Sequence, residues 1–316
     1  MSTKISKYPL SLISLVVILI ISGCQSTSVT PNVASTPTPA VNLTQKQVLT
    51  IGIISDDPAG TIEGFQPMID YLAKQMSDLG IAKGEVVVTP DFDTLNAKLK
   101  SGEVDLFYET AYGALDAFEN AGAIPLVRGW RKELDEYHST IFVKKDTNIT
   151  SVDDMRGHLI AFAEPDSTSG YFLPKAFLIS SGYNLFERSG TNTLPADQIG
   201  YVFAGSDDNV VSYVLHGTAE GGALENDAFD GLKQEEKDQL KVLAQTQDLP
   251  RSIMMASSTM SQPLRERIIS LLKAAAQTEE GKAVLKGAKK TTLFDELPLG
   301  PQATMDFLET VFAPVR

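Results

Sequence analysis

Short apolar runs alternate with amphipathic helical segments along most of this chain, and this alternation constrains the fold more than any other feature. Residues 48–54 form an apolar run rich in β-branched side chains, which is typical of a buried parallel strand. Residues 65–79 follow with apolar side chains at helical spacing, which predicts an amphipathic helix. The alternating order predicts an α/β fold with mostly parallel sheets. Further runs that predict strands lie at 85–89, 104–108, 124–127, 140–143, 159–162, 201–203, 222–224, 241–244 and 252–255.

The strand and helix pattern starts again near residue 139, which indicates two α/β lobes. The chain has 316 residues, enough for one large domain or two lobes of ordinary size. We predict that the first lobe uses residues 47–138 and 244–316. The second lobe, residues 139–243, is then inserted between the two parts of the first.

The N-terminal segment has the pattern of an export signal. Lys4 and Lys7 precede an apolar run at 10–21, which is short for a membrane span. The run ends in Ser-Gly followed by Cys24, which resembles a lipobox, so residues 1–23 are predicted to be a lipoprotein signal peptide. The alternative is a plain signal peptide with a chance cysteine. Cys24 is the only cysteine in the chain, which favours lipid attachment and excludes an internal disulfide.

The composition predicts a flexible tether and argues against nucleic acid as a partner. Residues 24–46 are rich in Ser, Thr, Pro and Asn, which predicts a flexible tether between the lipid and the folded part. The chain has 40 acidic and 27 basic residues, for a net charge of −13. This charge argues against nucleic-acid binding. An anion would have to be attracted by a local site, against the average field of the protein.

The sharpest local motif is a run of three hydroxyl residues, Ser167, Thr168 and Ser169, followed by Gly170. It comes after a predicted strand and opens a predicted helix. Free backbone N–H groups, hydroxyl donors and the positive end of a helix dipole together can hold an oxyanion without a basic side chain. The alternative is an ordinary Ser/Thr N-cap.

The same region resembles the phosphonate/phosphite/phosphate ABC-transporter substrate-binding family. The resemblance rests first on residues 151–157, 160–162 and 166–174. It runs from about residue 48 to the C-terminus. Supporting segments lie at 51–53, 65–72, 99–105, 205–208, 222–226 and 249–252.

This resemblance implies a two-lobe periplasmic-binding-protein fold that closes on its ligand about a hinge. The three hydroxyl residues would hold the phosphorus oxygens, a tyrosine and a threonine would add contacts from the other lobe, and two acids would select the rest of the ligand. By this similarity the ligand-binding residues are Ser167, Thr168, Ser169, Tyr108, Thr110, Asp208 and Glu225.

Two acids depart from the family pattern. After the third predicted strand the family often has Gly-Pro or Gly-Asn, but here residues 107–112 read Phe-Tyr-Glu-Thr-Ala-Tyr and include Glu109, and Asp207 stands where the family often has His. Each taken alone is expected to be a solvated carboxylate. If even two of the acids Glu109, Asp207, Asp208 and Glu225 face the cleft, a ligand with a positive group, such as an aminoalkylphosphonate, would relieve the repulsion of an anion. The alternatives are a protonated carboxylic acid that donates to the anion, or acids that face solvent. We favour an organophosphonate over bare phosphate. Lys289 and Lys290 are expected on a solvated helix face.

These features predict a lipid-anchored, exported protein that binds a small oxyanion and passes it to an ABC permease. It would face the periplasm or cell exterior and act as a monomer without a cofactor. The alternatives are a binder of another small molecule, such as a sulfonate or vitamin precursor, or a sensor partner.

An enzyme is not expected from the sequence. It would need a nucleophile with a base, or a metal set, and neither pattern is present. His138, His158 and His216 have no metal-ligand spacing.

Overall fold

The computed structural model of the protein describes residues 48–190 and 192–316. The predicted signal peptide, Cys24 and the predicted tether lie outside these residues. The described residues belong to one compact unit. Within them, no helix has both the length and the apolar character needed to cross a membrane.

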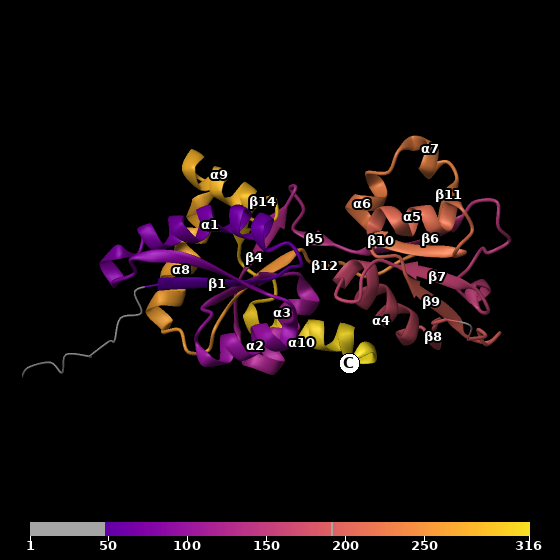
Figure 1. Ribbon diagram of the computed structural model, residues 1–316, viewed down its shortest axis with the longest axis horizontal. Coiled ribbons are helices and arrows are strands. Elements are labelled where there is room, and N and C mark those ends of the chain that lie inside the picture. The colour runs from indigo at the N-terminus through magenta and orange to yellow at the C-terminus, as the bar shows by residue number, and fades with distance from the viewer. Residues whose placement is uncertain (1–47, 191) are drawn as a thin grey trace, which may run out of the picture. The chain divides into compact units, whose positions relative to one another are not determined.

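The first sheet is built from strands at both ends of the described chain (Figure 1). Apolar residues at successive positions of these strands are buried on its two faces, as the sequence pattern predicts. The sheet has the order β14-β4-β13-β3-β1-β2. Its strands are β1 (Val48–Ile54), β2 (Lys83–Thr89), β3 (Leu106–Glu109), β4 (Ile124–Arg131), β13 (Ser252–Ala256) and β14 (Thr291–Asp295).

The second sheet lies in sequence between the two parts of the first (Figure 1). It has the order β11-β6-β10-β7-β9-β8. Its strands are β6 (Ser139–Lys144), β7 (Leu159–Phe162), β8 (Leu185–Glu187), β9 (Ile199–Phe203), β10 (Gly221–Glu225) and β11 (Leu240–Gln245).

Each sheet is mixed, with a parallel side and an antiparallel side, whereas the sequence pattern predicted mostly parallel sheets. In the first sheet β1 pairs in parallel with β2 and β3, while β13 pairs antiparallel with β3 and β4. In the second, β7 pairs in parallel with β9 and β10, while β6 pairs antiparallel with β10 and β11. The parallel pairs are joined through helices, as the alternating pattern predicts.

Helices cover the sheets and complete an α/β fold. Two core clusters lie on the first sheet, one under α1, α8 and α9 and one under α2, α3 and α10. The helical segments are α1 (Pro58–Lys74), η1 (Ser77–Leu79), α2 (Phe92–Ser101), α3 (Ala111–Ala121), η2 (Asp153–Met155), η3 (Thr168–Phe172), α4 (Leu173–Ser180), α5 (Asp207–Leu215), α6 (Asn226–Asp230), α7 (Gln234–Lys237), α8 (Gln262–Ala275), α9 (Glu279–Gly287), α10 (Pro301–Phe312) and η4 (Ala313–Val315).

The chain passes from one sheet to the other near β5 (Glu136–Tyr137) and returns near β12 (Leu249–Pro250). These two short strands pair antiparallel with each other. The start of α4 also joins the two halves, because Leu173 and Ala176 belong to the core cluster beneath α3 and α10. Residues from both sheets are thereby held close to one site.

Candidate functional site

A cavity of ≈ 420 Å³ opens between elements of the first and second sheets. Its volume lies within the range of small-molecule sites in proteins. Its lining is mostly polar, with hydroxyl, carboxylate and basic side chains. The residues are Ile54, Phe92, Glu109, Thr110, Arg131, Glu164, Asp166, Ser167, Thr168, Ser169, Ser206, Asp207, Glu225, Arg251 and Lys289.

The predicted hydroxyl motif forms one wall of this cavity. Ser167 caps a single π-helical turn, η3, which continues directly into α4, and its Oγ accepts a hydrogen bond of 3.0 Å from the backbone N–H of Gly170. A Cβ on Gly170 would lie 2.7 Å from the Ala163 Cβ, so the turn requires glycine. The first N–H groups of a helix have no partner within the helix. Ser167, Thr168 and Ser169 all line the cavity beside them.

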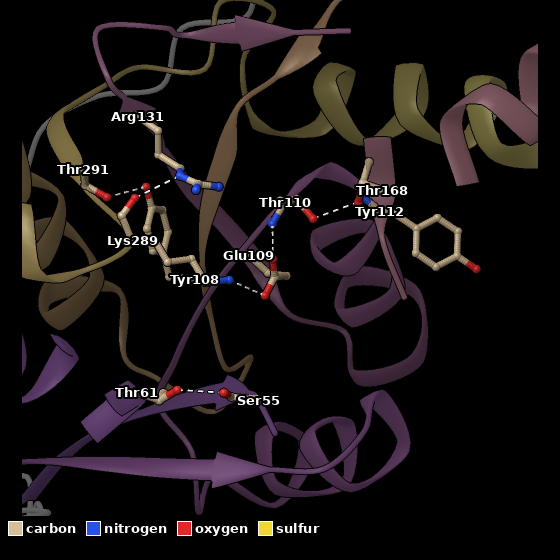
Figure 2. A network of polar contacts seen from close by, with 10 residues as sticks. All are labelled: Ser55, Thr61, Tyr108, Glu109, Thr110, Tyr112, Arg131, Thr168, Lys289 and Thr291. Carbon is tan, nitrogen blue, oxygen red and sulfur yellow. Dashed lines mark hydrogen bonds and ion pairs between the residues drawn. The ribbon is translucent and has the colours of Figure 1, made fainter. Parts of the chain in front are cut away.

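Thr110, from the first sheet, meets this motif directly. Its Oγ1 lies 2.8 Å from the Thr168 Oγ1, and the backbone N–H of Tyr112 lies 3.4 Å from the same Thr168 oxygen (Figure 2). Thr168 is 3% exposed. The predicted contacts Thr110 and Thr168 are therefore adjacent, although the sequence separates them by 58 positions.

Three basic side chains, Arg131, Arg251 and Lys289, also line the cavity. The sequence interpretation missed all three as site residues. Arg251 lies in the family-like segment at 249–252, which was a usable signal, whereas the other two had none. The expectation that Lys289 lies on a solvated helix face was wrong. Helix α9 ends at Gly287, and Lys289 follows it with a φ of 53° and lines the cavity.

Glu109 is held in an ion pair with one of these cations. Its Oε2 lies 2.6 Å from the Lys289 Nζ, and its Oε1 accepts a hydrogen bond of 2.8 Å from the Thr110 N–H (Figure 2). Burial would raise the pKa of Glu109, but the Lys289 ammonium and these hydrogen bonds outweigh it and hold the pKa below its ordinary value. The expectation of a solvated carboxylate was wrong for Glu109, because its side chain is 14% exposed and paired.

Glu225 is paired with a second cation. Its Oε1 lies 2.7 Å from the Arg251 Nη2. The Arg251 guanidinium stacks over the Tyr137 ring at 4.6 Å and is 3% exposed. Its Nε and Nη1 are buried without a hydrogen-bond partner among the described residues. Buried guanidinium groups are normally satisfied, so two donors of Arg251 lack the partners that such a group usually has.

Three acids on the second-lobe side of the cavity, Glu164, Asp166 and Asp207, have no ion-pair partner among the described residues. Desolvation raises the pKa of Asp207, and the charges of Glu225 and Asp208 raise it further. Desolvation also raises the pKa of Glu164, followed by the effects of Asp166 and Asp207. Both carboxyl groups are therefore poised to take up a proton more readily than ordinary acids.

Two predicted contacts lie outside the cavity lining. Tyr108 is fully buried, and its hydroxyl lies 3.0 Å from the Thr291 Oγ1 (Figure 2). The alternation of side chains along β3 directs Tyr108 into the core beside Phe294. Asp208 is exposed in the first turn of α5 and is not a lining residue, whereas its neighbour Asp207 is.

The arrangement suits recognition of an anion. Hydroxyl and backbone donors approach from one side, and guanidinium and ammonium groups approach from the other. No group of three or more His, Cys, Asp or Glu within residues 48–190 and 192–316 could hold a metal ion. Two α/β halves that line one polar cavity, joined by two crossing segments, define a two-lobed solute-binding protein.

The comparison with protein families agrees with this class. Residues 51–297 match the family described as "ABC transporter, phosphonate, periplasmic substrate-binding protein". The chain belongs to this family. Its members are substrate-binding components of transporters, not a class of enzymes, and they act outside the cytoplasm with an ABC permease.

One curated relative and several solved structures are similar to this chain. The chain is 23% identical over 231 residues to the phosphate-import protein PhnD of Mycolicibacterium smegmatis, covering 70% of each chain. XAC2383 from Xanthomonas citri, solved with chloride, is 31% identical with a TM-score of 0.79, covering 85% of this chain and 99% of that one. XAC2383 has also been solved with ATP. PhnD1 from Prochlorococcus marinus, in complex with methylphosphonate, is 16% identical with a TM-score of 0.61, covering 85% and 98%. These similarities confirm the predicted two-lobe α/β fold.

Proposed function

We propose that this protein captures a phosphonate, phosphite or phosphate in the described cavity for import by an ABC permease. The observation that carries the proposal is the meeting of the hydroxyl turn, Ser167 to Ser169, with three basic side chains around one cavity. Fixed hydrogen-bond donors and charges of this kind bind tetrahedral oxyanions. Family membership and the phosphate-import relative support the same ligand chemistry.

The proposal keeps Ser167, Thr168, Ser169, Thr110 and Glu225 as residues around the ligand, because all five line the cavity. In this proposal Tyr108 does not contact the ligand, because its side chain packs in the core and helps to position β3. Asp208 acts through its charge, which raises the pKa of Asp207.

The protein is further proposed to be a monomer, anchored by a lipid on Cys24 after removal of residues 1–23. The Ser-Gly-Cys ending of the apolar run supports this part. In Cys24→Ala, the protein should leave the membrane fraction or remain unprocessed, as seen by fractionation and mass spectrometry. Normal processing and anchoring of this variant would contradict the lipid attachment.

Two of the acids that favour an aminoalkylphosphonate ligand are neutralised within the protein. Glu109 is paired with Lys289, and Glu225 is paired with Arg251. Asp207 lines the cavity without an ion-pair partner, so it could pair with a positive group of the ligand. The basic side chains instead favour additional negative charge on the ligand.

A thermal-shift panel tests the ligand class. Phosphate, phosphite, methylphosphonate, aminoethylphosphonate and sulfate are compared, with a sulfonate and ATP added, the latter because XAC2383 has been solved with ATP. A ligand at a hundred times its dissociation constant should add about 2.7 kcal/mol of stability. Stabilisation by a phosphorus oxyanion supports the proposal. Stabilisation by the sulfonate or sulfate alone would overturn it in favour of another small-molecule binder.

A further inference from the structure

We propose that the cavity contains a second anion subsite, formed by Arg131, Arg251 and Lys289, and that its ligand carries two anionic groups. The inference rests on the proposed function, because it concerns the same cavity. One anionic group would sit at the hydroxyl turn that ends in Ser169. The other would sit at the three basic side chains.

The charges at the second subsite are not balanced by the protein. Lys289 is paired with Glu109, and Arg251 is paired with Glu225. Arg131 has no carboxylate within ion-pair distance among the described residues. Its Nε donates to the Lys289 carbonyl at 2.9 Å (Figure 2). Its terminal nitrogens have no hydrogen bond to any described residue. The cluster therefore retains one uncompensated positive charge.

Desolvation lowers the pKa of Arg131, and the positive charge of Arg251 lowers it further. Two guanidinium groups that repel each other in a partly buried site are stabilised when an anion enters between them. The direction of this pKa shift agrees with a subsite whose counter-charge is supplied by the ligand.

Unsatisfied donors gather at the same place. The Nε and Nη1 of Arg251 are buried without a hydrogen-bond partner in the described part of the chain. Buried donors normally have partners. An acceptor-rich group beside Arg251 would satisfy at least its two free nitrogens.

The volume of the cavity and the placement of the two subsites leave room for a ligand longer than one tetrahedral anion. The cavity of ≈ 420 Å³ corresponds to about fourteen times the ~30 Å³ that one water occupies in the liquid. The hydroxyl turn comes from the second sheet's side, through η3. The basic side chains come from the first, at the end of β4, before β13 and before β14. A ligand with an anion at each end would contact both lobes at once.

Calorimetry with matched ligands tests the inference. Methylphosphonate carries one anionic group, and methylenediphosphonate and phosphonoacetate carry two. We expect at least one of the latter pair to bind wild type about tenfold more tightly than methylphosphonate at the same pH and ionic strength, which is one added charge-assisted contact. Arg131→Gln should remove this preference, so that the two-charge ligands bind no more tightly than methylphosphonate to this variant. Arg156→Gln, which removes an exposed arginine paired with Asp153, should leave the preference intact.

Two outcomes overturn the inference. The first is that wild type prefers methylphosphonate or binds all three ligands equally, a result that needs no variant to be folded. The second is that the preference survives in Arg131→Gln and in the double variant Arg251→Gln, Glu225→Gln, which removes the second guanidinium without leaving its carboxylate unpaired. Failure of the proposed function is distinguishable, because then no phosphorus oxyanion binds at all.

Discussion

Thr168 is the residue at which the two halves of the site meet. Thr168 lines the cavity and its hydroxyl contacts the Thr110 hydroxyl, so this residue belongs to both the candidate site and the lobe contact. Sequence reasoning could identify it because the three hydroxyl residues are contiguous and followed by glycine. It could not identify Arg131 and Lys289, since these come from distant segments that only folding brings together, and it missed Arg251 although that residue lies in the family-like segment at 249–252.

Replacing Thr168 with valine keeps the shape and removes the hydroxyl. The loss of a hydrogen bond to a charged oxygen should cost about 1.5–3 kcal/mol, which weakens ligand affinity roughly tenfold to a hundredfold. Calorimetry measures the change, with Thr310→Val on the exposed side of α10 as the control. Wild-type affinity in Ser167→Ala, Thr168→Val and Ser169→Ala alike would refute the oxyanion assignment.

Asp207 and Glu164 make a prediction about pH. Their raised pKa values mean that they lose negative charge at a higher pH than ordinary carboxyl groups. As pH falls from 7 toward about 4, repulsion of the anion therefore decreases in wild type. The double variant Asp207→Asn, Glu164→Gln should bind more tightly than wild type at pH 7, and the two should converge at acidic pH.

The ratio of the two dissociation constants isolates this effect, because ionisation of the ligand is common to both proteins. Asp306→Asn, in α10 and outside the cavity lining, is the matched control and should behave as wild type. A ratio that stays constant across the pH range would show that these carboxyl groups do not act on the ligand.

At the scale of elements, η3 is the part that shapes the site. Its single π-helical turn places Ser167, Thr168 and Ser169 on the cavity and leads directly into α4. The sequence predicted a helix here but not the wider turn, because the turn depends on the close approach of Gly170 to Ala163.

Gly170→Ala should distort this turn. The added Cβ would lie 2.7 Å from the Ala163 Cβ and 2.8 Å from the Ser167 Oγ, so the chain must shift. Overpacking of this kind costs about 1–3 kcal/mol of stability. We also expect weaker ligand binding by calorimetry, while Ser181→Ala, just after the other end of α4, should leave affinity unchanged. Wild-type affinity in Gly170→Ala would show that the turn geometry does not matter.

Some strands could be predicted from the sequence and others could not. The apolar runs predicted β1, β7 and β13, because strands buried on both faces have a strong local signal. The short strand β14 was not predicted, since its sequence Thr-Thr-Leu-Phe-Asp gives only two apolar residues in a row. The antiparallel partners of β13 were also unpredictable, because strand order depends on contacts between residues far apart in sequence.

For the whole molecule, the contact between lobes centres on an aromatic stack. The rings of Tyr112, in α3, and Phe172, at the end of η3, lie 3.5 Å apart with an interplanar angle of 6°. The Thr110–Thr168 hydrogen bond lies beside this stack. Such aromatic pairs contribute about 0.5–1.5 kcal/mol beyond their buried area. They therefore favour the form in which both lobes contact the ligand.

Tyr112→Ala should shift the protein toward an open form and weaken ligand affinity by up to about tenfold, because binding would have to restore the lobe contact. Small-angle scattering with and without ligand, together with calorimetry, measures both effects. Tyr183→Ala is the control, since that ring contacts Arg156 within the second lobe. Unchanged affinity and scattering in Tyr112→Ala would show that the stack does not control closure.

The most direct test of the central claim is a calorimetric titration of the purified protein with phosphate, methylphosphonate and methylenediphosphonate. We expect saturable one-to-one binding of at least one of these anions and a loss of affinity of about tenfold or more in Thr168→Val. Absence of binding by all three anions, or equally tight binding in wild type and Thr168→Val, would contradict the claim that this cavity binds a phosphorus oxyanion through its hydroxyl turn.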